Sequence, residues 1–137
     1  MNALKELTEQ TQMYKAIRYP SVPAFALPKS KFKDNTANNL TKAIISLITL
    51  RGGFASRVST QGQFDPRLKA WRPGSVKKGM PDIVAIYKGL NLSIEVKIGK
   101  DRMSENQLKI KSQIESAGGR YFVARDFESF CEWFNKL

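Results

Sequence analysis

Two short segments rich in β-branched residues, joined by a turn, constrain the fold of this chain more than any other feature. The first spans residues 82–87 (Asp-Ile-Val-Ala-Ile-Tyr) and the second spans residues 92–97 (Leu-Ser-Ile-Glu-Val-Lys). Lys88-Gly89-Leu90-Asn91 lies between them. Two such segments on either side of a short, glycine-containing turn predict a β-hairpin.

The second strand of this hairpin has one apolar and one charged face. Side chains alternate along a strand, so Glu95 and Lys97 share a face and point away from the apolar side chains that a core needs, namely Leu92, Ile94 and Val96. If Lys88-Gly89 is a two-residue loop, Asp82 lies opposite Glu95; if all four intervening residues form the loop, Asp82 lies opposite Lys97. Either register places the three charged side chains on one face, with opposed Cβ atoms roughly 5 Å apart.

Two carboxylates at that separation repel each other unless a cation neutralises them. Mg²⁺ or Mn²⁺ prefers oxygen ligands, so Asp82 and Glu95 are candidate metal ligands, and the backbone carbonyl of Val96 between the functional side chains is a further one. Such a cation would orient and acidify an attacking water, while Lys97 could hold the nucleophile or a phosphate oxygen. An isolated Glu-x-Lys is usually an ordinary solvent-facing pair, but Asp82 at the matching register favours a metal site.

Three short motifs in order suggest a family. Gly79-Met80-Pro81-Asp82, Glu95-Val96-Lys97 and Ser104-Glu105-Asn106-Gln107 together resemble the VRR-NUC family of the PD-(D/E)xK nuclease superfamily, over roughly residues 36–137. The resemblance implies an α/β sandwich with a mixed central sheet flanked by helices. It also implies a divalent-metal DNA endonuclease with catalytic residues Asp82, Glu95, Lys97 and Gln107. Standalone members act as homodimers on branched DNA such as four-way junctions, so we expect a homodimer.

Gln107 has a second interpretation. Ser104 is a good helix N-cap, and Ser104-x-x-Gln107 is also the pattern of a capping box, in which both side chains bond the backbone. A site role is favoured by the position of Gln107 on the same helical stripe as Ile110 and Ile114, which should face the sheet.

The chain departs from the family pattern in its first core helix, which we expect over residues 37–51. The family usually contributes an acid there, but the apolar stripe Leu40, Ala43, Ile44, Leu47, Ile48 carries none, and Asn39 and Asp34 are only nearby polar candidates. A site with one metal remains chemically sufficient. The departure also leaves open a second function, that of a catalytically inactive DNA-binding module with a nuclease fold.

Charge supports DNA as the partner. The formal net charge is +11, and an excess of this size favours polyanions because each neutralised phosphate releases counterions. Basic residues lie on both sides of the proposed site in the sequence, and we expect the following to bind DNA: Arg57, Arg72, Lys77, Lys78, Lys100 and Arg102.

Composition excludes several other classes. The chain has no histidine, which rules out Ser-His-Asp hydrolysis and the common zinc sites that contain histidine. The single Cys131 cannot form a disulfide within the chain, which fits a reducing cytoplasm, and it lies in an aromatic segment typical of a core. No segment approaches the roughly 20 apolar residues of a membrane span.

The remaining elements can be placed coarsely. Residues 1–35 are expected to be an arm, with a weakly periodic helix over 3–18 and then several prolines, and residues 36–137 are expected to form one domain. We predict a strand over 54–59, a long functional loop over 60–80, a helix from Ser104 to Gly118, a strand over 120–124 and a final helix over 126–136.

Overall fold

The hairpin predicted from the sequence forms the centre of a four-stranded sheet. In the computed structural model, which describes residues 2–58, 63–72, 74 and 76–137, β4 (Ile83–Tyr87) pairs antiparallel with β5 (Leu90–Val96). Tyr87 lies opposite Leu90, so the loop is the two-residue one. Lys88 and Gly89 have φ of 50° and 75°, the left-handed conformation that tight hairpin turns require at both central positions.

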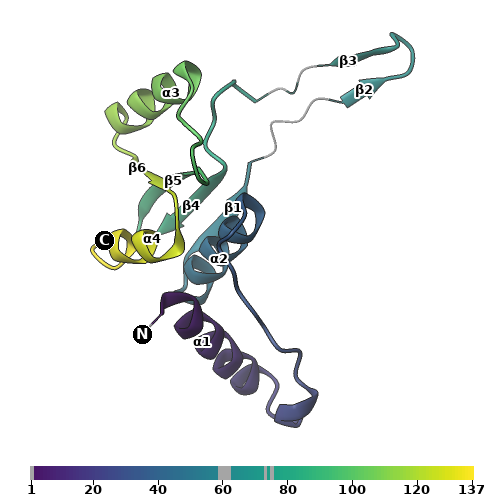
Figure 1. Cartoon of the computed structure of the whole chain (residues 1–137), viewed down its shortest axis with the longest axis vertical. Coiled ribbons are helices and arrows are strands. Elements are labelled where there is room, and N and C mark those ends of the chain that lie inside the picture. The colour runs from purple at the N-terminus through teal and green to yellow at the C-terminus, as the bar shows by residue number, and fades with distance from the viewer. Residues whose placement is uncertain (1, 59–62, 73, 75) are drawn as a thin grey trace.

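The sheet is mixed, as expected. Its strand order is β1-β4-β5-β6, with β1 (Phe54–Arg57) antiparallel to β4 and β6 (Arg120–Ala124) parallel to β5 (Figure 1). Parallel neighbours need a crossover, and α3 (Glu105–Ser116) provides it between β5 and β6. The predicted order of helix, three strands, helix, strand and helix is confirmed for this sheet and the helices around it.

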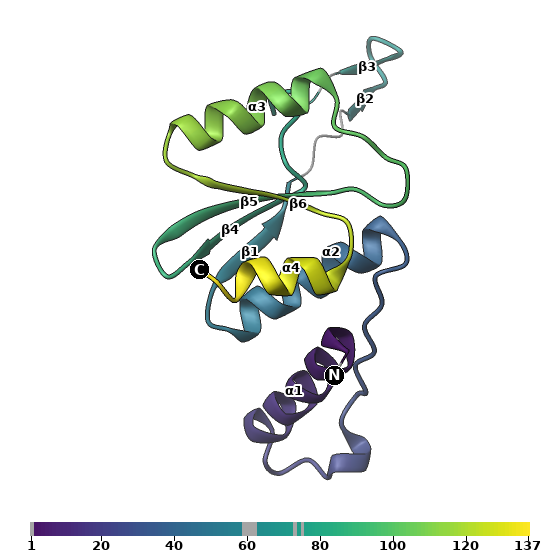
Figure 2. The same cartoon turned by 60° about the vertical axis from the view of Figure 1, so that its left-hand side comes forward.

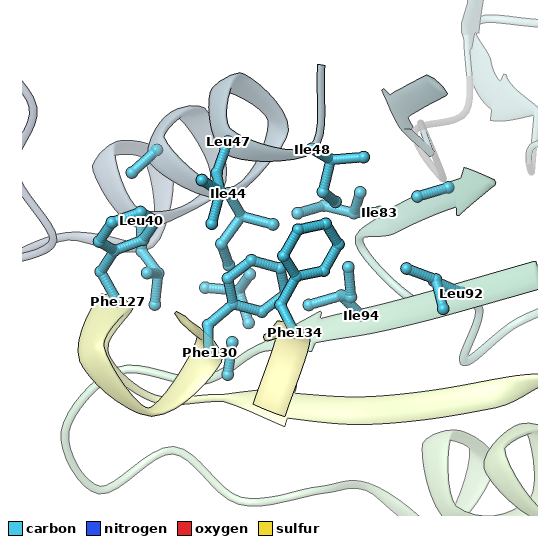
Figure 3. Packing of buried hydrophobic residues seen from close by; sticks show 14 of the residues in the cluster. Leu40, Ile44, Leu47, Ile48, Ile83, Leu92, Ile94, Phe127, Phe130 and Phe134 are labelled. Atoms are coloured by element: carbon cyan, nitrogen blue, oxygen red, sulfur yellow. The ribbon is translucent and has the colours of Figure 1, made fainter. Parts of the chain in front are cut away.

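Helices cover both faces of the sheet. Figure 2 shows α3 on one face, with α2 (Ala37–Leu50) and α4 (Phe127–Phe134) on the other. The main core lies between the sheet and these two helices (Figure 3), where the stripe predicted on α2 is buried together with apolar side chains of the strands and α4: Ile83, Leu92, Ile94, Phe127, Phe130 and Phe134. The predicted α/β sandwich is therefore confirmed.

The first turns of the N-terminal helix belong to this core. α1 (Ala3–Arg18) packs against α2 and α4, and Leu7 is only 1% exposed within the core cluster. The backbone N–H of Ala3 donates to the Glu128 carboxylate on α4. The following segment, which contains the short 3₁₀ helix η1 (Ala24–Ala26), is mostly exposed. A domain boundary at residue 36 stays a prediction.

The prediction of a long loop over residues 60–80 is wrong in one respect, because a second sheet forms within this stretch. β2 (Gln63–Asp65) and β3 (Ala70–Arg72) form an antiparallel hairpin that projects away from the body of the molecule (Figure 1). Strands of three residues are too short to show alternation in the sequence. The strand predicted over 54–59 ends earlier, since β1 stops at Arg57; Ser59 lies outside the described residues.

Two other expectations can be compared with the structure. Cys131 is half-buried on α4, and burial, followed by the nearby Glu128 carboxylate, raises the pKa of its thiol to about 11, so it is a poor nucleophile at neutral pH. In the part of the chain that the structure describes, no helix has the length and apolar character needed to cross a membrane.

Candidate active site

The three charged residues singled out in the sequence meet at one end of the central hairpin. Ile83 pairs with Ile94, so Asp82, one residue earlier, lies opposite Glu95. They face an open pocket, which most of the site residues expected from the sequence line together: Arg57, Asp82, Glu95, Val96, Lys97 and Gln107. Side chains from β1, β5, α3 and the start of β4 therefore converge there.

The charged face of β5 is not solvent-exposed. It lies beneath α3, and Glu95 is only 2% exposed. Burial, reinforced by the nearby Asp82 carboxylate, raises the pKa of Glu95 to about 7, and the Lys97 ammonium opposes this increase. An ordinary surface Glu-x-Lys pair is excluded by this burial.

Glu95 is held through one of its two oxygens. Its Oε1 accepts a hydrogen bond from Gln107 Nε2 at 3.0 Å and lies 3.5 Å from Lys97 Nζ. Its Oε2 is buried and has no hydrogen-bond partner among the residues that the structure describes. An unpaired buried carboxylate oxygen costs free energy unless a cation or a proton satisfies it. The site therefore fits a divalent cation.

Pro81 and Asp82 alter the backbone bonding of Val96. The strand register places Pro81 opposite Val96. Proline has no N–H, so it cannot donate to the Val96 carbonyl as another ladder residue there would. The Val96 N–H instead donates to Asp82 Oδ2 at 2.8 Å. This arrangement orients the Asp82 carboxylate and frees the neighbouring carbonyl as a potential metal ligand.

Gln107 forms the predicted capping box and also contacts Glu95, while its part in catalysis stays a prediction. Its side-chain oxygen accepts from the Ser104 N–H, its own N–H donates to Ser104 Oγ, and its side-chain nitrogen donates to Glu95. The capping box thus fixes the side chain that orients the carboxylate.

Gly79 lets the first turn of α3 approach the site. Its φ is 87°, and a Cβ atom there would lie 2.5 Å from the backbone C and O of Asn106 and 2.8 Å from the backbone N of Gln107. Only glycine tolerates both this conformation and this contact. The lack of a side chain at Gly79 therefore lets the backbone of Gln107 come close enough for its side chain to reach Glu95.

Helix α2 contributes polar groups that sequence reasoning missed. Asn38 and Thr41, both on α2, line the pocket, and Asn38 accepts hydrogen bonds from the Arg57 guanidinium through its side-chain and backbone oxygens. Thr41 is 5% exposed, and its hydroxyl donates to the Ala37 carbonyl. Thr41, a polar residue next to the apolar stripe of α2, was the sequence signal that could have indicated these pocket residues.

The two polar candidates considered near this helix lie elsewhere. Asn39 donates to Asn35, and Asp34 accepts from the Phe127 N–H at the start of α4. Neither lines the pocket. Across residues 2–58, 63–72, 74 and 76–137, the structure brings no three Asp, Glu or Cys side chains together in a group that could hold a metal. The pocket instead has two carboxylates, from Asp82 and Glu95, and two cations, from Arg57 and Lys97.

The remaining basic candidates divide into two groups. Lys77 and Lys78 are exposed just before Pro81-Asp82, and Lys100 and Arg102 are exposed in the loop between Lys97 and α3. Arg72 differs, because it lies on the projecting β2–β3 hairpin and forms an ion pair with Asp65 at 2.7 Å.

Of the comparisons with known proteins, the one with solved structures bears on the fold. No family model matches the sequence. No curated protein matches it either. Among solved structures, a chain described as a VRR_NUC domain superposes with a TM-score of 0.50 and 20% sequence identity, covering 76% of this chain and 96% of that one. This chain therefore has a nuclease-like α/β fold. The particular fold is that of a VRR_NUC domain, as the motif resemblance implied.

The raised pKa of Glu95 predicts a pH-dependent stability in the absence of divalent metal. The folded protein retains a proton up to about pH 7, whereas the unfolded chain loses it near the ordinary value of 4.5. The folded state thus binds more protons between these values, and stability falls as pH rises through them. Glu95→Gln should remove this loss and be more stable than the wild type by about 3 kcal/mol at pH 8, since each pKa unit is worth about 1.4 kcal/mol.

Urea unfolding in EDTA from pH 4 to pH 8 measures this difference. The advantage of Glu95→Gln should shrink as pH falls and disappear below the unfolded-state pKa. A difference that does not change with pH would contradict the burial of an ionisable Glu95.

Gly79→Ala should destabilise the protein more than a matched substitution at Gly52. Both glycines have φ of 87°, but a Cβ atom at Gly52 would meet nothing within 4 Å. Gly52→Ala should therefore cost only the left-handed strain, about 1–2 kcal/mol. Gly79→Ala must also displace the first turn of α3. Equal losses in free energy of unfolding for the two variants would show that the close approach of Gly79 to Asn106 does not contribute to stability.

Proposed function

We propose that this chain is a divalent-metal-dependent DNA endonuclease. The observation that carries the proposal is the buried Glu95, with one oxygen unpartnered among the described residues, facing Asp82 and adjoining Lys97 on a nuclease-like fold. Asp82, Glu95 and the Val96 carbonyl would hold Mg²⁺ or Mn²⁺. When bound, the ion would supply Lewis-acid stabilisation of charge on the phosphate and increase the acidity of a coordinated water.

The side chains of this chain supply positioning and charge around the reacting phosphate. Gln107 holds Glu95 in one orientation, and Lys97, beside Glu95 and with a side chain only 13% exposed, can donate to the attacking water or to a phosphate oxygen. Arg57 is anchored by Asn38 at the pocket and can pair with a second phosphate oxygen. The first turn of α2 also borders the pocket, and the partial positive charge there favours a phosphate.

The balance of charge in the pocket supports one metal ion instead of two. With both carboxylates ionised, the cations Arg57 and Lys97 already offset their charge, and Asn38 and Thr41 add no negative charge from α2. A second divalent ion would have no acidic ligand of its own. Metal affinity should therefore depend on oxygen ligands from the DNA phosphate, which Mg²⁺ sites commonly use.

Branched or otherwise structured DNA is the substrate class that we propose. The family resemblance points to this class, and the net charge of +11 supports a nucleic acid partner, whether branched or linear.

A catalytically inactive DNA-binding module is the second candidate. It is favoured by the absence of an acid on the pocket side of α2, where Asn38 and Thr41 lie. Lys97 argues for catalysis, because binding alone does not require an amine beside a buried carboxylate. The two candidates share the fold and differ only in whether DNA is cleaved.

Substitutions at the site test the difference. Asp82→Asn, Glu95→Gln and Lys97→Ala should each reduce Mg²⁺- or Mn²⁺-dependent cleavage of branched DNA at least about 100-fold, because each removes a charged group that acts on the transition state. Binding should change much less. Glu105→Gln, an exposed carboxylate on α3, is the matched control and should cleave normally. Cleavage by Glu95→Gln at the wild-type rate would contradict the assignment, and a wild type that binds but never cleaves would establish the module.

The DNA track should include Lys77 and Lys78. They are exposed and lead directly into Pro81-Asp82, so we expect phosphate contacts that position DNA without reading its sequence. Replacing both by Gln should weaken binding to all sequences alike and make the salt dependence shallower by about one or two units of slope.

A matched control removes the same charge near the turn of the β4–β5 hairpin, at the end opposite to Asp82 and Glu95. Lys88 and Lys136 are exposed there, and Lys88 contacts the C-terminal Leu137. Their double replacement by Gln should leave the slope near the wild-type value. Equal slopes for the two double variants would move the track elsewhere.

Symmetrical cutting of a branch requires two sites, and each chain offers one, so we propose a twofold homodimer. The exposed apolar side chains between Tyr19 and Pro28, with Phe25 at 88% exposure, are our candidate for part of the interface. Light scattering over a concentration series should show a dimer, and Phe25→Ser should weaken it, whereas Phe54→Ser on β1, at an exposed phenylalanine outside this segment, serves as the control. A strictly monomeric wild type, with and without junction DNA, would exclude paired cutting.

A further inference from the structure

The projecting β2–β3 hairpin exposes an aromatic pair. Phe64 and Trp71 lie opposite each other in the ribbon, with ring centroids 5.8 Å apart and an interplanar angle of 64°. Phe64 is 51% exposed and Trp71 is 73% exposed, and Leu68 at the tip is 63% exposed. None of the three belongs to the core cluster. Folding of the domain therefore does not explain them.

The rest of the ribbon is polar and basic. Asp65 forms the ion pair with Arg72 and also accepts from the backbone N–H of Arg67, which fixes the turn. Arg67 and Lys69 are exposed in that turn, and they leave the hairpin with a positive charge after Asp65 and Arg72 cancel. Aromatic faces between cations are suited to a ligand that is both flat and anionic.

The hairpin is inserted in the sequence between two strands that border the candidate active site. These are β1 and β4, whose ends carry Arg57 and Asp82. Val58, which lines the pocket, donates its N–H to the Asp82 carbonyl. Figure 1 shows the ribbon extending outward from this end of the sheet. DNA that extends beyond the pocket on this side would therefore run toward the hairpin.

We propose that the hairpin spanning Gln63–Arg72 is a base-stacking element, in which Phe64 and Trp71 bind unpaired nucleobases while Arg67 and Lys69 contact the adjacent phosphates. In an uninterrupted duplex the base faces are already stacked on one another, so they offer no surface to the aromatic pair. Bulges, forks and single strands do. The hairpin therefore gives the site a preference for DNA with unpaired bases, an inference that rests on the proposed action on DNA.

Charge complementarity favours this ligand over a second copy of the chain. The exposed Arg67 and Lys69 of this turn would repel the basic surface of a second copy, so any pairing of two copies is expected elsewhere on the molecule. Nucleic acid offers both the negative charge and the flat apolar faces.

Binding by the full-length chain without divalent metal tests the proposal separately from cleavage. The probes are an uninterrupted duplex, the same duplex with a bulge of unpaired bases, and one of its single strands. The double variant Phe64→Ala with Trp71→Ala should lose about tenfold or more in affinity for the bulged and single-stranded probes and little for the duplex. Phe54→Ala, which removes another exposed aromatic ring, is the matched control and should leave this selectivity unchanged.

Two further measurements separate stacking from a merely structural role. Trp71→Phe keeps an aromatic face and should retain most of the affinity that the double variant loses. The fluorescence of Trp71 should be quenched by unpaired probes and not by duplex, while Trp133, which packs against Phe122, reports on the fold. The urea midpoint of the double variant should equal that of the wild type, because the hairpin lies outside the core.

The possible results of these measurements bear differently on the stacking proposal and on the nuclease proposal. Equal loss on all probes, or no loss on any, would overturn the stacking proposal while leaving the nuclease proposal intact. A change in mass by light scattering with unchanged DNA selectivity would make the hairpin a protein contact instead. A wild type that binds none of the probes would overturn both proposals.

Discussion

The candidate site depends on the burial of one carboxylate. Glu95 is covered by α3, and its Oε1 is held between Gln107 and Lys97. Burial raises its pKa to about 7, so in the absence of a cation the folded protein loses stability as pH rises. A bound cation would reverse this effect, because it interacts favourably with the charged form. The burial that lowers stability without a metal is thus the same feature that would favour the binding of a cation.

The short motifs around this carboxylate have mostly geometric roles. Gly79 allows α3 to approach the site. Pro81 has no N–H, so it leaves the Val96 carbonyl without a donor from the opposite strand. The Val96 N–H donates to the Asp82 carboxylate. Ser104 holds Gln107 through the capping box. Gly79, Pro81 and Ser104, which have no reactive side chain in the proposed chemistry, therefore help to orient the two carboxylates.

Under the proposed function, two kinds of surface group would share the recognition of DNA. Exposed cations such as Lys77 and Lys78, just before Pro81-Asp82, would contact phosphates without reading bases. The exposed aromatic side chains of the β2–β3 hairpin would instead respond to whether bases are stacked. Phosphate contacts and base stacking together would allow a domain of this size to distinguish structured DNA from plain duplex.

The sequence alone determined the local elements and the shared strand face of Asp82, Glu95 and Lys97, whereas the structure chose the register that brings Asp82 opposite Glu95. Alternation along β5, the apolar stripe of α2 and glycines at turns depend on neighbours in the chain, so they can be predicted from it. Other features depend on contacts between distant segments: the burial of Glu95 under α3, the hydrogen bond of Gln107 to Glu95, the pairing of Arg57 with Asn38 and the docking of Leu7 in the core. These were decided only by the tertiary structure, because no local pattern records which helix covers which face of a sheet.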